Sequence, residues 1–309
     1  MIDIIIPAYN NHKTIEKTLL SISYQTISDK LNVYLVNDKS DNDYHDIVNK
    51  YSKYIKIVEI DLDENVGPGL AREEGLKASK SDYFMFIDAD DVFASPKSIE
   101  LIHKTIIDEK ADIVIGKFVE VLPNDYIQHY EDQIWLHGKI FKRSFIEKHN
   151  IHFNNTRINE DNFFVQCVLL SNPKISYYEY PIYFWDYNPD SITRRNNSEF
   201  SYKGISGYIN NMYAALDFAI NNNCNKSLIA NKPYSVLVAT YYYYVRYEDT
   251  EFLELISKVK KIYKEYKEFV TDKANIDSTQ YKMAIESLDE KKINSTELSF
   301  DEFMSKVGD

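Results

Sequence analysis

Three carboxylates follow one apolar segment of this sequence, in the order Asp88-Ala89-Asp90-Asp91. The preceding residues 83–87 are nearly all apolar, which is typical of a buried strand. Carboxylates crowded at a strand end repel one another and cost desolvation free energy unless a cation joins them. Oxygen ligands suit Mg²⁺ or Mn²⁺, and such an ion can bridge a diphosphate. The cluster therefore predicts metal ligands at Asp88, Asp90 and Asp91, although an acidic stretch before the next helix explains the spacing equally well.

Three more segments place polar residues where an apolar run ends. They are Pro7-Ala8-Tyr9-Asn10, Val36-Asn37-Asp38-Lys39-Ser40-Asp41 and Asn65-Val66-Gly67-Pro68-Gly69-Leu70-Ala71-Arg72. The last segment is a glycine-containing turn that leads into a helix, and a helix N-terminus with the cation of Arg72 suits phosphate. At Asp38 an exposed carboxylate can accept a hydrogen bond from a nucleotide base, or it can simply form a turn. Each segment alone is common, so the prediction depends on their meeting in space.

Residues farther along the chain are candidates for the acceptor side of a reaction. Glu160 and Asp161 open a predicted helix, where one of them can act as a general base or where the helix dipole simply stabilises both acids. The candidates for an acceptor pocket are Trp135, His137 and Lys139. His137 also has a structural interpretation, and it is the next candidate for the base. The guanidinium groups of Arg194 and Arg195 can clamp phosphates or belong to a solvated loop.

The elements that must position these residues alternate between strand and helix. The expected strands cover residues 2–6, 31–36, 55–60, 83–87, 111–121 and 175–180. The expected helices cover residues 14–25, 44–51, 69–79, a segment from Ser95-Pro96 through Ile106, 141–149 and 160–170. This alternation with short connections predicts a parallel α/β architecture. In such a sheet ligands bind beyond the carboxyl ends of the strands, where the polar segments would converge.

The strands stop after about residue 198, and helical spacing follows. Helices are expected over 205–221, 234–247, 251–268 and 280–287. We therefore expect a catalytic domain over 1–200 and a helical domain over 201–309. Residues 241–244 are all tyrosine, so their helix would be apolar on every side and buried against the catalytic domain or a second subunit.

The composition is that of a globular protein, with 44% hydrophobic and 27% charged residues. The net charge of −12 argues against a broad nucleic-acid surface, which would need a basic face. No apolar run of about 18 residues and no signal-peptide pattern is evident, which predicts a cytoplasmic protein and leaves peripheral membrane association open. Cys167 and Cys224 are interpreted as reduced thiols, because two cysteines make no disulfide framework.

Taken in order, these motifs resemble those of the family-2 inverting glycosyltransferases, over roughly residues 1–195. The resemblance implies the GT-A fold, a Rossmann-like, mostly parallel sheet flanked by helices, followed here by an α-helical C-terminal region. It implies that Pro7, Tyr9 and Asp38 hold the nucleotide base and that Arg72 stands near the nucleotide. The other residues that the matching segments place on the donor side are Ala8, Asn10, Asn65, Gly67, Asp88 and Ala89. Asp88 would lie near the ribose and metal, Asp90 would ligate the metal, and Asp161 would be the catalytic base, with Glu160 in support.

The resemblance implies a metal-dependent, inverting transfer of a hexose or N-acetylhexosamine to an acceptor hydroxyl. The donor would be a nucleoside-diphosphate sugar, with uridine the most frequent nucleoside in the family, and the cofactor Mn²⁺ or Mg²⁺. Bacterial members of this size often decorate cell-surface polymers such as teichoic acid or capsule. The Gln-x-x-Arg-Trp element of processive membrane synthases is not evident, which favours an enzyme that adds a single sugar.

Three alternatives stay open at this point. A phage-type glucosyltransferase would modify hydroxylated DNA bases, although the negative charge argues against it. A nucleotidyltransferase would need a glycine- and lysine-rich signature after the first strand, where residues 7–10 supply none. A non-catalytic nucleotide-sugar-binding module would have no need of the acids at 160–161.

Overall fold

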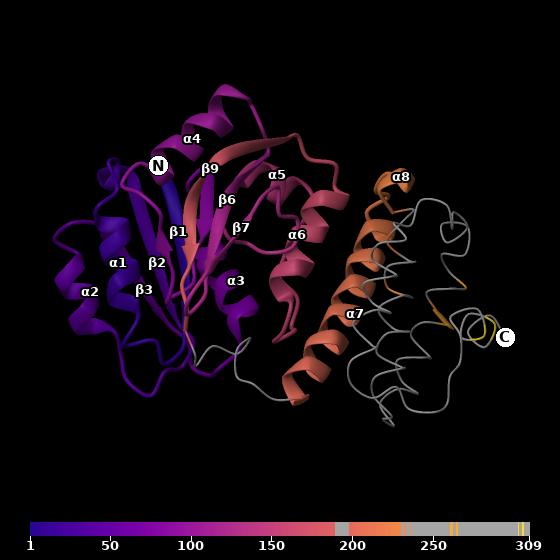
Figure 1. The fold of residues 1–309 in the computed structure, drawn as a ribbon, viewed down its shortest axis with the longest axis horizontal. Helices are drawn as coiled ribbons and strands as arrows, with labels where there is room; N and C mark the ends of the chain where they lie inside the picture. Colours follow the sequence, from indigo (N-terminus) through magenta and orange to yellow (C-terminus); the bar gives the residue numbers. More distant parts are fainter. Residues whose placement is uncertain are drawn as a thin grey trace. The chain divides into compact units, whose positions relative to one another are not determined.

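The computed structural model describes residues 1–188 and 198–229, together with the isolated positions 232, 236, 260, 261, 264, 302 and 305. The chain divides into two compact units, residues 1–169 with 173–194 and residues 170–172 with 195–309. All the strands of the described part lie in the first unit (Figure 1). Within that described part, no helix has the length and apolarity needed to cross a membrane.

One half of the sheet is parallel, as predicted. It contains β1 (Ile2–Ala8), β2 (Leu31–Asn37), β3 (Lys56–Asp61) and β4 (Tyr83–Phe86), in the spatial order β3-β2-β1-β4. A short 3-10 helix, η1 (Ser28–Lys30), leads into β2. Every residue of β1 and β2 is buried, which explains why both strands are apolar on both faces. Because the four strands run the same way, their carboxyl ends form one edge.

The other half of the sheet is mixed, and sequence analysis missed three of its strands. It contains β5 (Val92–Phe93), β6 (Ile113–Val121), β7 (Tyr126–His129), β8 (Lys139–Lys142) and β9 (Ile175–Trp185). The strand β8 runs antiparallel to both β4 and β6, whereas β9 runs parallel to β6. The helix predicted over 141–149 is therefore wrong at its start, because residues 141–142 belong to β8 and the helix α5 covers only Arg143–Lys148.

Helices cover the sheet on two faces. On one face α1 (Ile15–Ser23), α2 (His45–Tyr51) and α4 (Ser98–Asp108) contribute apolar side chains to the main core with Ile4 and Ile6 of β1. The other face carries α3 (Pro68–Ala78), whose Gly75 lies against Ile5 and Val36. The prediction that Ser95 caps α4 and Pro96 opens it is wrong by two residues, because the N-cap is Lys97 and Ser95 bonds to the Ser98 hydroxyl in a preceding turn.

An aromatic cluster joins α6 (Glu160–Leu170) to the same face as α3. Its rings stack or meet edge to face, and they belong to Phe84, Phe86, Phe141, Phe153 and Phe164. The helix α6 has the predicted bounds. Its packing against the sheet fixes the position of its first residues, Glu160 and Asp161.

The second unit is described by two helices. These are α7 (Ser198–Asn221), which includes the helix expected over 205–221, and α8 (Lys226–Ile229). The helices expected over 234–247, 251–268 and 280–287, and with them the tyrosines 241–244, lie outside the described residues. Among the described residues, Cys167 and Cys224 form no disulfide; Cys167 is buried and Cys224 is partly exposed.

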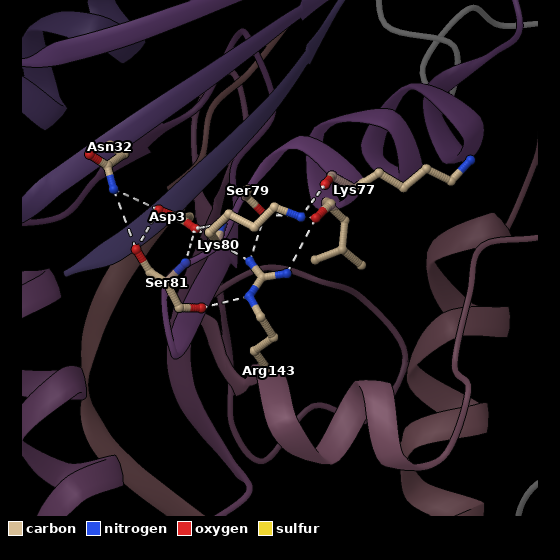
Figure 2. Close-up of polar contacts among 8 residues, drawn as sticks. Asp3, Asn32, Lys77, Ser79, Lys80, Ser81 and Arg143 are labelled. Atoms are coloured by element: carbon tan, nitrogen blue, oxygen red, sulfur yellow. Dashed lines mark hydrogen bonds and ion pairs between the residues drawn. The ribbon is translucent and has the colours of Figure 1, made fainter.

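A buried polar network closes the amino ends of the parallel strands (Figure 2). Asp3 is fully buried, and its carboxylate accepts hydrogen bonds from Asn32, from the backbone and hydroxyl of Ser81, and from the backbone of Lys80. The guanidinium of Arg143 lies 3.3 Å from Asp3 and donates to the Ser79 hydroxyl at 2.6 Å. The charges of Asp3 and Arg143 are paired, so we assign this edge of the sheet a structural role.

Candidate active site

At the opposite edge, the side chain of Arg72 connects two distant parts of the chain. Its Nη2 donates to Oδ1 of Asp88 at 2.6 Å, and its Nη1 donates to Oε1 of Glu160 at 2.7 Å. The guanidinium is 5% exposed, and the pKa of Arg72 is raised because Asp88 and Glu160 outweigh the effect of burial. Burial opposes ionisation of Asp88, yet Arg72 holds the pKa of Asp88 below its usual value. Asp88 and the first residue of α6 thus bind the same guanidinium group.

The adjacent acids Glu160 and Asp161 have different surroundings. Glu160 is buried against Arg72, whereas Asp161 is partly exposed and accepts a hydrogen bond from the backbone N–H of Asn162. Burial, and next the charge of Glu160, raise the pKa of Asp161 to about 8. A carboxylate with a raised pKa is a stronger base, and the two side chains diverge as adjacent helical residues do.

The glycines of the 65–72 segment let α6 approach α3. A Cβ on Gly69 would lie 2.8 Å from Cγ of Glu160, so only glycine fits there without a shift. Gly67 adopts φ +90° at the N-cap of α3, a conformation that L side chains rarely adopt. A contact of these glycines with phosphate stays a prediction.

Asp38 is buried, so the expectation of an exposed carboxylate is wrong. Its side chain is 3% exposed because the 65–67 turn folds over the end of β2. Oδ1 accepts from the Val66 N–H at 2.7 Å, and Oδ2 accepts from the Gly67 N–H at 2.9 Å and from Nδ2 of Asn65 at 3.1 Å. Asp38 therefore organises this turn, and its contact with a nucleotide base stays a prediction.

The loops that follow β1 and β2 are joined to each other. Asn10 has φ 56°, and its backbone N–H and side-chain amide donate to Ser40 and Asp41. The ring of Tyr9 remains 50% exposed beside them, while Pro7 and Ala8 are buried in β1. An exposed aromatic ring on a fixed loop provides a surface on which a planar base can stack.

Within the acidic cluster, Asp91 is engaged with β9. It is fully buried, and its two carboxylate oxygens accept from the Tyr183 hydroxyl and the Asp186 backbone N–H. Asp90 accepts a hydrogen bond from Nδ2 of Asn188 at 2.8 Å. Burial and the neighbouring Asp88 raise the pKa of Asp90. The like charges of the cluster are therefore only partly compensated by protein groups.

A divalent cation fits this cluster. Among the described residues, Asp88, Asp91 and His137 each offer a ligand atom, and these atoms lie within 4.8 Å of one another. Burial lowers the pKa of His137 to about 4, so its imidazole is neutral at pH 7, as a metal ligand must be. The structure thus groups His137 with two of the three acids that sequence analysis proposed, and the metal role of Asp90 stays a prediction.

The acceptor-side candidates separate into two groups. His137 and Trp135 lie together among aromatic rings, with the His137 centroid 5.1 Å from Trp185 and 4.9 Å from Tyr183. Lys139 is fully buried and donates to Asp132 at 3.1 Å, and its role in an acceptor pocket stays a prediction. Arg194 and Arg195 lie outside the described residues.

Sequence analysis missed several residues that contact the candidates. Tyr183 and Asn188 bond to the acidic cluster from β9 and the segment after it. Arg157 donates to Asn65 through both terminal nitrogens, from a loop three residues before Glu160. No sequence motif identifies these residues, because each makes its contact with a segment that is far away in the sequence.

Comparison with known proteins gives consistent matches. A sequence model of the family described as Glycosyl transferase family 2 matches residues 3–158. The poly(ribitol-phosphate) beta-N-acetylglucosaminyltransferase TarP of Staphylococcus aureus is 27% identical over 219 residues, which are 64% of this chain and 67% of TarP. The poly(ribitol-phosphate) beta-glucosyltransferase of Bacillus spizizenii is 28% identical over 193 residues, which are 57% of this chain but only 30% of that protein.

A solved structure extends the likeness of fold. The structure of S. aureus TarS 1-349 in complex with UDP-GlcNAc superposes with a TM-score of 0.70 at 18% identity. The match covers 96% of this chain and 98% of that one.

Proposed function

Because this chain belongs to glycosyl transferase family 2 and is a glycosyltransferase with the predicted GT-A fold, we propose that it decorates a cell-surface polymer. The reaction would be a metal-dependent, inverting transfer of a hexose or N-acetylhexosamine from a UDP-sugar. The acceptor would be a hydroxyl of a teichoic-acid or capsule polymer. The names of two relatives, which act on poly(ribitol-phosphate), and the UDP-GlcNAc complex of TarS support this choice.

The observation that carries the proposal is the bridge made by Arg72. It joins Asp88, at the end of β4 where the donor would bind, to Glu160, next to the proposed base Asp161. The proposed donor site and the proposed proton acceptor would thus be held in one arrangement. A nucleotide-binding module would have no need for a carboxyl group whose pKa is raised to about 8 beside its ligand.

In the proposed step, the acceptor oxygen attacks the anomeric carbon from the face opposite the diphosphate. The bond between that carbon and the diphosphate oxygen breaks, its electron pair leaves with UDP, and the acceptor proton passes to Asp161. Asp88, Asp91 and His137 are the residues that would hold the cation, with Asp90 proposed beside them, and a bound cation would neutralise the leaving diphosphate. Arg72 keeps Glu160 occupied, which leaves Asp161 free to face the acceptor.

The test is a survey of donors with and without acceptor. The protein is incubated with UDP-glucose, UDP-GlcNAc and other UDP-sugars in Mn²⁺, and UDP release is measured alone and with purified poly(ribitol-phosphate), poly(glycerol-phosphate) or capsule. Slow UDP release from one donor, accelerated by one polymer, supports the proposal. Binding without turnover would identify a binding module, release of sugar 1-phosphate by attack on the α-phosphate would identify a nucleotidyltransferase, and transfer to added hydroxymethylated DNA would identify a phage-type enzyme.

A further inference from the structure

The segment before α6 lies directly on the donor-side turn. A Cβ on Gly67 would be 3.2 Å from Cγ of Arg157, and a Cβ on Gly69 would be 2.8 Å from Cγ of Glu160. The side chains of Arg157 and Glu160 therefore lie directly on Gly67 and Gly69, with no room for a further side chain at either glycine. The contact at Gly67 comes from the alkyl part of Arg157, which fixes where the guanidinium can reach.

The guanidinium of Arg157 continues this contact as a chain of hydrogen bonds. Its Nη1 donates to Oδ1 of Asn65 at 2.5 Å, and its Nη2 donates to the backbone oxygen of Asn65 at 2.7 Å. The amide of Asn65 in turn donates to the backbone oxygen and to Oδ2 of Asp38, at 3.0 and 3.1 Å. Arg157 thereby orients both the backbone and the side chain of a residue bound to the end of β2.

We propose that Arg157 is a positioning residue for the donor, which secures the nucleotide end of the site by holding Asn65 against Asp38. The inference rests on the proposed function, in which this edge receives the nucleotide. Without Arg157, the Asn65 side chain and the 65–67 turn would sample other positions. The nucleotide would then have to order the turn on binding, and its affinity would fall.

The effect should fall on donor binding more than on the chemical step. The start of α6 has independent anchors, because Glu160 bonds to Arg72 and packs on Gly69 whether or not Arg157 is present. Asp161 should therefore keep its place in an Arg157 variant. This separation of binding from rate would not arise from a general loss of stability.

A second contact of the same loop supplies a matched control. Nδ1 of His152 lies 2.8 Å from Oε1 of Glu73 on α3, and His152 is exposed, as Arg157 is. His152→Gln changes a partly buried contact between this loop and α3 without touching Asn65. It should leave the donor KM unchanged.

The experiment measures UDP affinity by calorimetry in Mn²⁺, together with donor KM and kcat, for the wild type, Arg157→Gln, Arg157→Lys and His152→Gln. We expect Arg157→Gln to raise the UDP Kd and donor KM about five- to tenfold, in line with the loss of charged hydrogen bonds at an exposed site, with kcat within about twofold. Arg157→Lys, which keeps the alkyl chain over Gly67 and one donor, should lie between. The double variant Asn65→Ala with Arg157→Gln should have a UDP Kd no higher than that of whichever single variant binds UDP more weakly.

The outcomes separate the two levels of the proposal. Wild-type affinity in both Arg157 variants would overturn this inference and leave the glycosyltransferase proposal intact. A wild type that binds no nucleoside diphosphate would overturn both. If Arg157→Gln does not fold, Arg157→Lys and Asn65→Ala carry the test, and equal KM values in these two and the wild type would overturn the inference.

Discussion

Asp161 is the residue on which the proposed chemistry depends most directly. The hydroxyl of an acceptor has a pKa far above neutral, so a positioned carboxylate must take its proton as the new bond forms. Asp161→Asn keeps the shape of the side chain and removes its basicity. We expect the transfer rate to fall about 10²-fold or more while UDP affinity stays near that of the wild type. Steady-state kinetics and calorimetry check this, and nearly normal transfer would show that Asp161 is not the base.

The raised pKa of Asp161 predicts a pH dependence. The base must be deprotonated to act, and burial together with Glu160 raises its pKa to about 8, so kcat/KM should rise with pH through this region. Glu160→Gln removes the negative neighbour, and the rise should then move to lower pH. Profiles of both proteins between pH 6 and 9.5 provide the measurement. A flat wild-type profile would speak against Asp161 as the base.

The acidic cluster predicts dependence on a divalent cation. Asp90→Ala should abolish transfer and greatly weaken UDP binding in Mn²⁺, because the carboxylates and the diphosphate need a shared cation. EDTA should have the same effect on the wild type, and Mn²⁺ or Mg²⁺ should reverse it. Full wild-type activity in EDTA would exclude this role. Asp88→Ala is a less specific test, since Asp88 also binds Arg72.

At the residue scale, sequence analysis identified residue types better than their surroundings. Glu160 and Arg72 were both singled out, but their ion pair joins positions 88 residues apart and could not be foreseen. Asp38 and Lys139 were expected to be accessible, but Asp38 is buried under the 65–67 turn and Lys139 is buried beside Asp132. Burial of a charged side chain depends on its partner, and a single sequence does not reveal the partner.

At the scale of elements, two glycines of α3 allow close packing against different neighbours. A Cβ on Gly75 would lie 2.6 Å from Ile5 of β1, inside the sheet interface, whereas a Cβ on Gly69 would press on Glu160. Gly75→Ala should lower the free energy of unfolding by about 1–3 kcal/mol, as overpacking does, with kcat little changed. Gly69→Ala should lower kcat by displacing the start of α6. Thermal melts and kinetics on the pair check this, and equal effects on kcat would contradict it.

Elements with strong periodicity were predicted well, and short strands were not. The four parallel strands and α6 have nearly the expected bounds, because long apolar runs and helical spacing are strong signals. The strand β8 has only four residues, Lys-Ile-Phe-Lys, and it joins directly to a helix. Its place between β4 and β6 comes from tertiary pairing, which local pattern does not encode.

For the whole molecule, the parallel strands connect two edges of unlike character. At the amino ends, Asp3 and Arg143 neutralise each other within a hydrogen-bonded network (Figure 2). At the carboxyl ends, Asp90 and Asp161 both have raised pKa values, which means that the fold disfavours their charged forms.

The division of the chain into domains over 1–200 and 201–309 remains our proposal.

The raised pKa of Asp161 implies that thermal stability and activity place opposite demands on this residue. A folded-state pKa of about 8 for Asp161, against 3.8 for an ordinary aspartate, means that the folded state holds this proton more tightly than the unfolded state. The contribution of this group to stability is therefore complete below about pH 4 and is lost as the pH rises towards 8. Asp161→Asn should melt at a higher temperature than the wild type at pH 8, and the difference should shrink at pH 5. Random mutagenesis screened for heat resistance alone would then also retain inactive descendants, because replacing an acid that the proposed reaction requires is one route to higher stability.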